Sequence, residues 1–286
     1  MPVLHSRSAF DYVSLVNDLC RLSAFLIIAS AFGDQENLPT WMNMPIQLCA
    51  GIIGCHRRTQ QRMAQELEAA RQVQNLLVSG GQTAAENLEI STAYLPAQEV
   101  GGDFYYVLDG RVVVLGDVSG KGLKAAMLVS LLIGVLRDTT QRRPDVLDAL
   151  NRAIAGQVDG GFVTCVCARF ETDGDATFAN AGHLPPYLDG TEINLDAHFP
   201  LGVIREIQYT ETTVRISPGS VVTLVSDGVV EAMNARRELF GFDRTREIST
   251  TNAGKIVEAA RAWGQSDDIT VVTVRRKYSS ALLRKD

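Results

Sequence analysis

Glu99-Val-Gly-Gly-Asp-Phe-Tyr105 and Gly116-Asp-Val-Ser-Gly-Lys-Gly122 are the stretches that decide the fold of this chain, because each sets an aspartate at the edge of an apolar run. Three further segments continue the pattern: Asn180-Ala-Gly-His183, Ser226-Asp-Gly228 and Ser266-Asp-Asp-Ile-Thr270. Aspartates far apart in the sequence can converge when each lies at a strand end. Converging carboxylates repel one another unless cations neutralise them, and oxygen-only ligands prefer Mg²⁺ or Mn²⁺ to zinc. The sequence therefore predicts a hydrolytic site that holds a hard metal.

The composition is that of a globular protein with one large domain and an extension. Of its 286 residues, 46% are hydrophobic and 21% are charged, and the net charge of −6 argues against a broad nucleic-acid surface. No zinc-type CxxC pair occurs, and we expect Cys165 and Cys167 to pack on the same side of one strand. Five cysteines without a clear signal peptide favour a reducing cytosol for the catalytic domain.

Residues 1–56 form an N-terminal apolar extension that differs from the rest of the chain. Two uncharged runs, Leu22–Gly33 and Asn37–Cys55, are separated by acidic residues and followed by Arg57 and Arg58. Membrane association of residues 12–55 as a helical hairpin is one interpretation, although a membrane helix needs about 20 mostly apolar residues. The others are a small helical extension that packs on the domain or on a second subunit, and a start codon assigned too early.

Residues 57–80 are predicted to be a helical linker, because Arg57–Ser79 is rich in good helix formers and lacks Gly and Pro. Its apolar residues form a narrow seam like that of a coiled coil: Met63, Leu67, Ala70, Val73 and Leu77. The helix is either docked on its own domain or a signalling linker that dimerises, giving a homodimer, or transmits a conformational state. Both interpretations stay open.

Residues 81–276 are predicted to form an α+β layered domain, with residues 277–286 as a tail. Strands are expected at Leu88–Leu95, Phe104–Leu108, Val112–Val118, Phe162–Phe170, Ala176–Asn180, Tyr187–Leu188, Gln208–Ile216, Ser220–Val225 and Ile269–Arg275. Helices are expected at Leu123–Thr140, Pro144–Ala155, Phe242–Ile248 and Gly254–Trp263. Many hairpin-joined strands with paired helices favour this class over a doubly wound sheet.

Four aspartates carry the predicted chemistry. Asp103 enters a strand, Asp117 and Asp227 follow apolar runs, and Asp267 precedes the last strand beside Asp268. Their charge of about −4 would be balanced by two divalent ions, which could activate a water for in-line phosphoryl transfer without a protein nucleophile. The glycines of the second motif do not have the spacing of a Walker A or a Rossmann motif, which argues against a nucleotide-binding loop. We expect instead that they allow a backbone carbonyl to reach a metal.

The five segments, in this order, resemble the PPM-type metal-dependent protein phosphatases, and within them the bacterial branch of SpoIIE and RsbU, serine phosphatases that regulate stress and sporulation sigma factors. The resemblance covers about Ala64–Arg275. It implies an αββα sandwich of two antiparallel sheets between helical layers, two Mn²⁺ or Mg²⁺ ions, and a phosphoserine or phosphothreonine protein substrate. The implied metal ligands are Asp103, Asp117, the Val118 carbonyl, Asp227 and Asp267, and a swapped role between Asp267 and Asp268 stays open.

The sequence departs from the family pattern at three places. Tyr106 stands where the family often has Asp, which we expect to lie outside the metal shell, and Ser119 replaces a histidine of eukaryotic relatives. No general acid is evident, and His183 is better interpreted as a structural histidine than as that acid. The segment between Phe242 and Gln265 is expected to be too short to hold two helices easily.

Three functions compete at this point. The leading hypothesis is a phosphatase that acts on a small regulatory protein, an anti-sigma-factor antagonist with a STAS fold. The second is a catalytically weak or inactive signalling scaffold of the same fold, against which the presence of all the metal aspartates argues. The third is another two-metal hydrolase such as a phosphodiesterase, and four histidines in the whole chain are few for such a site.

Overall fold

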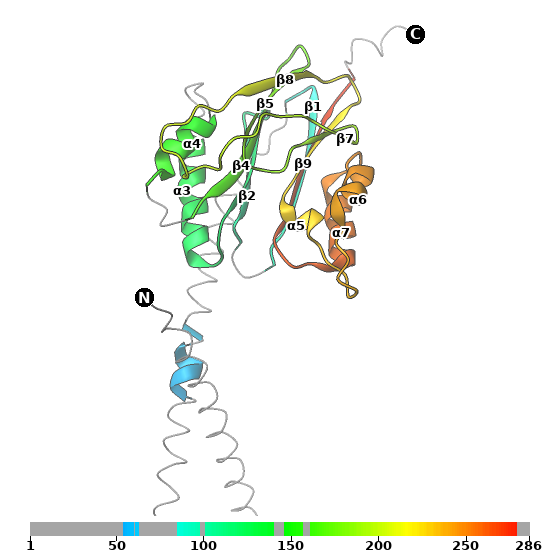
Figure 1. Cartoon of the computed structure of the whole chain (residues 1–286). Coiled ribbons are helices and arrows are strands. Elements are labelled where there is room, and N and C mark those ends of the chain that lie inside the picture. Colours follow the sequence, from blue (N-terminus) through cyan, green and yellow to red (C-terminus); the bar gives the residue numbers. More distant parts are fainter. Residues whose placement is uncertain are drawn as a thin grey trace, which may run out of the picture. The chain divides into compact units, whose positions relative to one another are not determined.

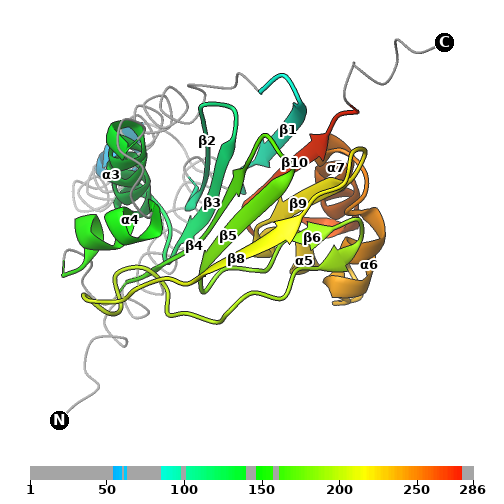
Figure 2. The same ribbon diagram turned by 90° about the horizontal axis from the view of Figure 1, so that it is seen from above.

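The computed structural model describes residues 54–59, 61–62, 85–97, 101–139, 146–156 and 161–278. The chain divides into two units, Met1–Glu66 and Leu67–Asp286. The second unit contains two five-stranded antiparallel sheets that face each other, with helices covering both outer faces (Figures 1 and 2). The predicted α+β sandwich is therefore confirmed.

Each sheet is covered by its own helices. The first sheet has the order β2 (Asp103–Leu108), β3 (Val112–Val118), β4 (Val163–Phe170), β5 (Asp175–Ala181) and β8 (Glu211–Arg215), beneath α3 (Leu123–Thr139) and α4 (Val146–Ile154). The second has the order β1 (Leu88–Leu95), β10 (Ile269–Arg276), β9 (Val221–Val225), β6 (Tyr187–Leu188) and β7 (Thr191–Glu192). It lies against α5 (Asp227–Val230), α6 (Gly241–Ile248) and α7 (Ala253–Gly264).

The alternation of side chains along β2 sorts the core into layers. Tyr105 and Val107 belong to the cluster between the two sheets, whereas Phe104 and Tyr106 belong to the cluster beneath α3 and α4. A third cluster lies between the second sheet and its own helices. Because successive residues of a strand point to opposite faces, two consecutive tyrosines pack in two different layers. Cys165 and Cys167 share the layer beneath α3 and α4, as expected.

The β2–β3 hairpin fixes the register on which the site depends. Its turn, Asp109-Gly110, has positive φ at both residues (49° and 64°), the conformation that two-residue hairpin turns favour. From this turn the ladder runs back to its open end, where Asp103 is the direct partner of Asp117. This tight turn therefore also sets two of the predicted site aspartates opposite each other.

The two helices predicted at Phe242–Ile248 and Gly254–Trp263 are confirmed as α6, of 8 residues, and α7, of 12 residues. The expectation that this segment leaves little room for two helices was wrong. A compact turn makes this possible, because the Asn252 side chain accepts a hydrogen bond from the Lys255 amide at 2.9 Å and starts α7 at once. The short elements α5 and β7 were not predicted, since four or two residues carry no detectable periodicity.

Residues 54–59 and 61–62 are helical, and the remainder of the predicted linker and of the N-terminal extension lies outside the described residues. The membrane hairpin, the apolar seam and residues 279–286 of the predicted tail therefore stay as predictions. Within the described part of the chain, no helix has the length and apolar character needed to cross a membrane.

The layer between the sheets makes a direct prediction. Leu115 of β3 is completely buried there, whereas Leu131 of α3 is 45% exposed. We expect Leu115→Ala to lower the free energy of unfolding by about 2–5 kcal/mol, because it removes buried methyl groups and leaves a cavity. Leu131→Ala should change it by no more than about 0.5 kcal/mol. Urea denaturation of both variants measures the difference, and equal losses would contradict this account of the core.

Candidate metal centre

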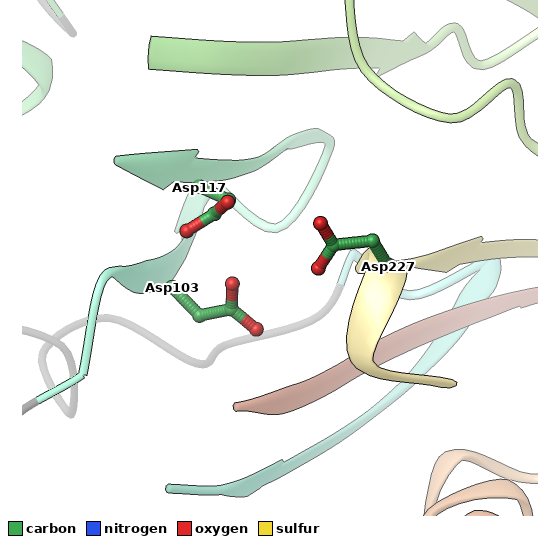
Figure 3. A group of neighbouring side chains, drawn as sticks. All are labelled: Asp103, Asp117 and Asp227. Atoms are coloured by element: carbon green, nitrogen blue, oxygen red, sulfur yellow. The ribbon is translucent and has the colours of Figure 1, made fainter. Parts of the chain in front are cut away.

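Three of the predicted aspartates meet at one end of the sandwich. One carboxylate oxygen from each of Asp103, Asp117 and Asp227 lies within 4.8 Å of the other two. Figure 3 shows the three side chains pointing toward one another from β2, from β3 and from the start of α5. Asp227, which lies more than a hundred positions after the other two in the sequence, is thus brought with them into one oxygen-lined group.

The pairing of β2 with β3 places two of these carboxylates side by side. Asp103 is the register partner of Asp117, and both share the strand face of Tyr105 and Leu115, which pack between the sheets. Like charges directly opposite in a ladder are destabilising. Asp103 is also 2% exposed, so water offsets little of this repulsion.

The third carboxylate comes from the opposite sheet. The strand β9 ends at Val225, and Asp227 begins the short helix α5 directly after Ser226. Gly228 permits this placement, because a Cβ atom there would lie 1.9 Å from the carbonyl oxygen of Asp268. Only a glycine lets α5 approach the backbone of Asp268 so closely.

Thr270 ties the two sheets together at the site. Its hydroxyl donates to Oδ2 of Asp103, and its amide donates to the Ser226 hydroxyl at 2.9 Å. Thr270 and Ser226 are both completely buried. A buried carboxylate requires such partners, and these contacts hold Asp103 in one orientation.

Asp268 positions the loop that leads into β2. Its Oδ1 accepts the amide of Ala97 at 2.7 Å and its Oδ2 accepts the amide of Gly102 at 2.8 Å. A carboxylate that receives two backbone amides is a strong anchor. Both oxygens of Asp268 are directed at this loop, which ends at Asp103, so the residue acts here as a support for the cluster.

Asp267, which the resemblance placed among the metal ligands, has a different partner in this structure. Lys121 Nζ lies 2.9 Å from both Oδ1 and Oδ2 of Asp267, and Oδ1 also accepts the amide of Asp268 at 2.9 Å. The side chain of Asp267 is 39% exposed. It is not brought into the group of three carboxylates, although its charge adds to the effect of burial, the main cause, in raising the pKa of Asp117 and of Asp227.

Gly102 keeps a space beside two oxygen atoms. A Cβ atom at this position would lie 2.8 Å from the carbonyl oxygen of Val118 and 2.9 Å from Oδ1 of Asp117. These two oxygens therefore gather beside the same glycine, where a side chain would displace whatever they bind. The arrangement fits the prediction that the Val118 carbonyl adds to the metal ligands.

The three carboxylates resist ionisation while no cation is present. Burial, followed by the charge of Asp117, raises the pKa of Asp103 well above its usual range. Burial, followed by the charge of Asp227, raises the pKa of Asp117 to about 7. Burial, with Glu231 as the next cause, raises the pKa of Asp227. One buried and two partly buried carboxylates that repel one another beside a backbone carbonyl fit a hard divalent cation, which would offset the repulsion.

His183 and Tyr106 are not members of the group of three carboxylates. His183 is 8% exposed, its Nδ1 is 2.9 Å from the Thr164 hydroxyl, and Asn180 brackets its backbone with two hydrogen bonds. Burial lowers the pKa of His183 to about 4, so the ring is neutral at pH 7. This supports the structural interpretation of His183. Tyr106 packs in the layer beneath α3 and α4.

Sequence reasoning did not identify the roles of Lys121 and Thr270. Lys121 is a single cation between two glycines of an acidic motif, and such a position is a signal for an ion pair. Thr270 closes the last motif and lies on the same face of β10 as Val272 and Val274, which pack between the two sheets. This period of two along the strand could have placed its hydroxyl between the sheets.

The raised pKa values predict how the metal-free protein responds to pH. A carboxyl whose pKa is higher in the folded state than in the unfolded state stabilises the fold at low pH, and this stabilisation is lost as the pH rises through the folded value. For Asp117 the loss runs from about pH 4 to about pH 7. In EDTA at pH 8, Asp117→Asn should therefore raise the free energy of unfolding by about 1–2 kcal/mol.

Urea denaturation at pH 5 and pH 8 measures this effect, with Glu192→Gln on the exposed strand β7 as the matched control. The pH dependence should be smaller in the Asp117 variant than in the control. The same pH dependence in wild type and in both variants would contradict the repulsion inferred for the cluster.

Comparison with known proteins agrees with this geometry. The sequence pattern of the Stage II sporulation protein E (SpoIIE) family matches residues 109–277. Phosphoserine phosphatase RsbU of Bacillus subtilis (strain 168) is 28% identical over 244 residues, which are 77% of this chain and 73% of RsbU.

Solved structures share the fold. The RsbU and RsbW domains of Rv1364c from Mycobacterium tuberculosis superpose with a TM-score of 0.57 at 26% identity, covering 66% of this chain and 60% of that chain. The catalytic domain of the serine threonine protein phosphatase PstP, solved with 2 manganese ions, gives a TM-score of 0.53 at 20% identity, covering 67% and 99% of the two chains. The family pattern spans more than half of the chain and the fold agrees with it, so the protein belongs to the SpoIIE family and is a PP2C-type protein phosphatase.

Proposed function

We propose that this phosphatase hydrolyses phosphoserine or phosphothreonine on a regulatory protein and uses two Mn²⁺ or Mg²⁺ ions. The observation that carries the proposal is the convergence of Asp103, Asp117 and Asp227 on one point in a chain of the SpoIIE family. A phosphoryl group is anionic, so a cluster of carboxylates cannot receive it unless cations lie between them. The cluster therefore has a use in this chemistry only as a metal site.

Different residues of this chain would bind the two ions. Asp103, Asp117 and Asp227 would bind them through carboxylate oxygens, the Val118 carbonyl would add a backbone ligand, and Asp267 would serve the side of the second ion. When bound, the ions would activate a water for in-line attack at phosphorus and offset the charge that develops on the phosphoryl oxygens. The two manganese ions of PstP, which shares this fold, support a site of two ions.

The hydrogen bonds of Thr270 and Asp268 would keep Asp103 in position for metal binding. Thr270 fixes the orientation of Asp103, and Asp268 fixes the loop that ends at Asp103. A metal ligand held by such contacts needs no rearrangement when the ion binds. The substitution of Tyr106 for an acidic residue leaves these contacts intact, because Tyr106 packs in another layer.

The proposed substrate follows from the relatives. RsbU is named a phosphoserine phosphatase, and its resemblance to this chain extends over most of both proteins. We therefore expect the substrate to be a small phosphorylated regulator of a sigma-factor pathway, of the type of an anti-sigma-factor antagonist with a STAS fold. The catalytic domain would act on this partner in the cytoplasm.

Metal-dependent turnover tests the site. Phosphate release from an aryl phosphate should require Mn²⁺ or Mg²⁺, and Asp117→Asn and Asp227→Asn should each lower kcat/KM by at least about 100-fold, because each removes a metal ligand. Glu192→Gln should leave the rate unchanged. Metal binding without turnover in the wild type would favour the signalling scaffold or a phosphatase that needs an activating partner. If the wild type neither binds metal nor releases phosphate, the proposed site is rejected.

A protein substrate tests the specificity. A STAS-type antagonist phosphorylated on serine should be dephosphorylated in the presence of Mn²⁺ at least about tenfold faster than a phosphotyrosine peptide at equal concentration, because a larger docked surface contributes binding energy. Phosphate release in a stopped assay measures both rates. Equal rates, or a faster reaction of the phosphotyrosine peptide, would reject the proposed substrate class.

A further inference from the structure

The ion pair between Lys121 and Asp267 is a feature that the proposed function leaves unexplained. The ammonium nitrogen of Lys121 is 2.9 Å from each carboxylate oxygen of Asp267, and the two residues are 146 positions apart in the sequence. Their side chains are 48% and 39% exposed. Exposed ion pairs of this kind contribute little to stability, so folding alone does not account for it.

The loop after β3 is built to present Lys121 at this place. Gly120 and Gly122 have φ values of 101° and 80°, a left-handed conformation that L side chains rarely adopt. Ser119 anchors the loop to Phe162, since the Ser119 amide donates to the Phe162 carbonyl at 2.9 Å and the Phe162 amide donates to the Ser119 hydroxyl at 2.8 Å. The lysine therefore projects from a fixed loop two residues before α3 begins.

Lys121 and a divalent cation would bind the same carboxylate group, that of Asp267. Both oxygens of Asp267 face the ammonium group, so this carboxylate is engaged while the three others converge on one another. Asp267 nevertheless lies close enough to the cluster for its charge to act on Asp117 and on Asp227. An ammonium group and a metal ion cannot both occupy the same face of one carboxylate, and their positive charges repel.

We propose that Lys121 is a positioning residue that competes with the second divalent cation for Asp267, so that full metal loading requires this ion pair to separate. The inference rests on the proposed function, because it assumes that the carboxylate cluster binds metal. It predicts one ion bound through Asp103, Asp117 and Asp227, and a second ion bound more weakly because it must displace the ammonium group from Asp267.

Calorimetric titration of the full chain with Mn²⁺ tests the inference without relying on activity. In Lys121→Gln the second binding step should tighten by about three- to tenfold, as the loss of one competing charge allows, while the first step changes less. Lys121→Arg keeps a cation that can hold Asp267, so it should resemble the wild type. Lys124→Gln is the matched control, because it removes the same charge from an exposed position only three residues away.

The outcomes separate this inference from the proposed function. If Mn²⁺ binds to the wild type but the second step is unchanged in Lys121→Gln, or tightens as much in Lys124→Gln, the competition is overturned and the metal site stands. If neither the wild type nor the variants bind Mn²⁺ while circular dichroism shows them folded, the proposed metal site fails and the inference fails with it.

Discussion

The repulsion between Asp103 and Asp117 is the constraint around which this end of the molecule is organised. The β2–β3 register sets the two carboxylates opposite each other, and burial deprives Asp103 of most of its hydration. Neither residue can move away without shifting a ladder whose other positions lie in the core. Such an arrangement opposes folding unless protons or cations bind. A divalent cation bound between these carboxylates would remove this repulsion, which is the physical basis of the metal site proposed here.

The two sheets contribute unequally to the site. The first sheet supplies Asp103 and Asp117 from one rigid hairpin, and the second supplies Asp227 from a short helix that follows a strand. Contacts across the sandwich, above all the hydrogen bond from Thr270 to Asp103, hold the carboxylates of the two sheets close to one another. The cluster is thus a property of the packing between sheets, which the apolar layer behind it maintains.

Adjacent residues perform different tasks because strands and tight turns direct them differently. Asp267 faces Lys121 at the surface, whereas Asp268 is 7% exposed and holds the loop before β2 through two amides. Tyr105 and Tyr106 likewise enter different layers. The departure from the family pattern at Tyr106 therefore affects the packing beneath α3 and α4 and leaves the group of three carboxylates in place.

The sequence by itself determined the α+β sandwich, most of its strands and helices, and the group of aspartates from which a metal site can be built. The strands, the helices and the aspartates rest on local signals such as alternation along strands, the Asp109-Gly110 turn and acidic motifs at strand ends, whereas the two-sheet sandwich was implied by the resemblance to the PPM-type phosphatases. Only the tertiary structure decided that Asp267 pairs with Lys121 and that Asp268 supports a loop, because these contacts join residues 146 and 171 positions apart. Nothing in the sequence of the final motif distinguishes Asp267 from Asp268, and only the packing gives the two side chains different surroundings. The short helix α5 could not be predicted either, because four residues show no helical periodicity. Its position depends on the close approach of Gly228 to the backbone of Asp268.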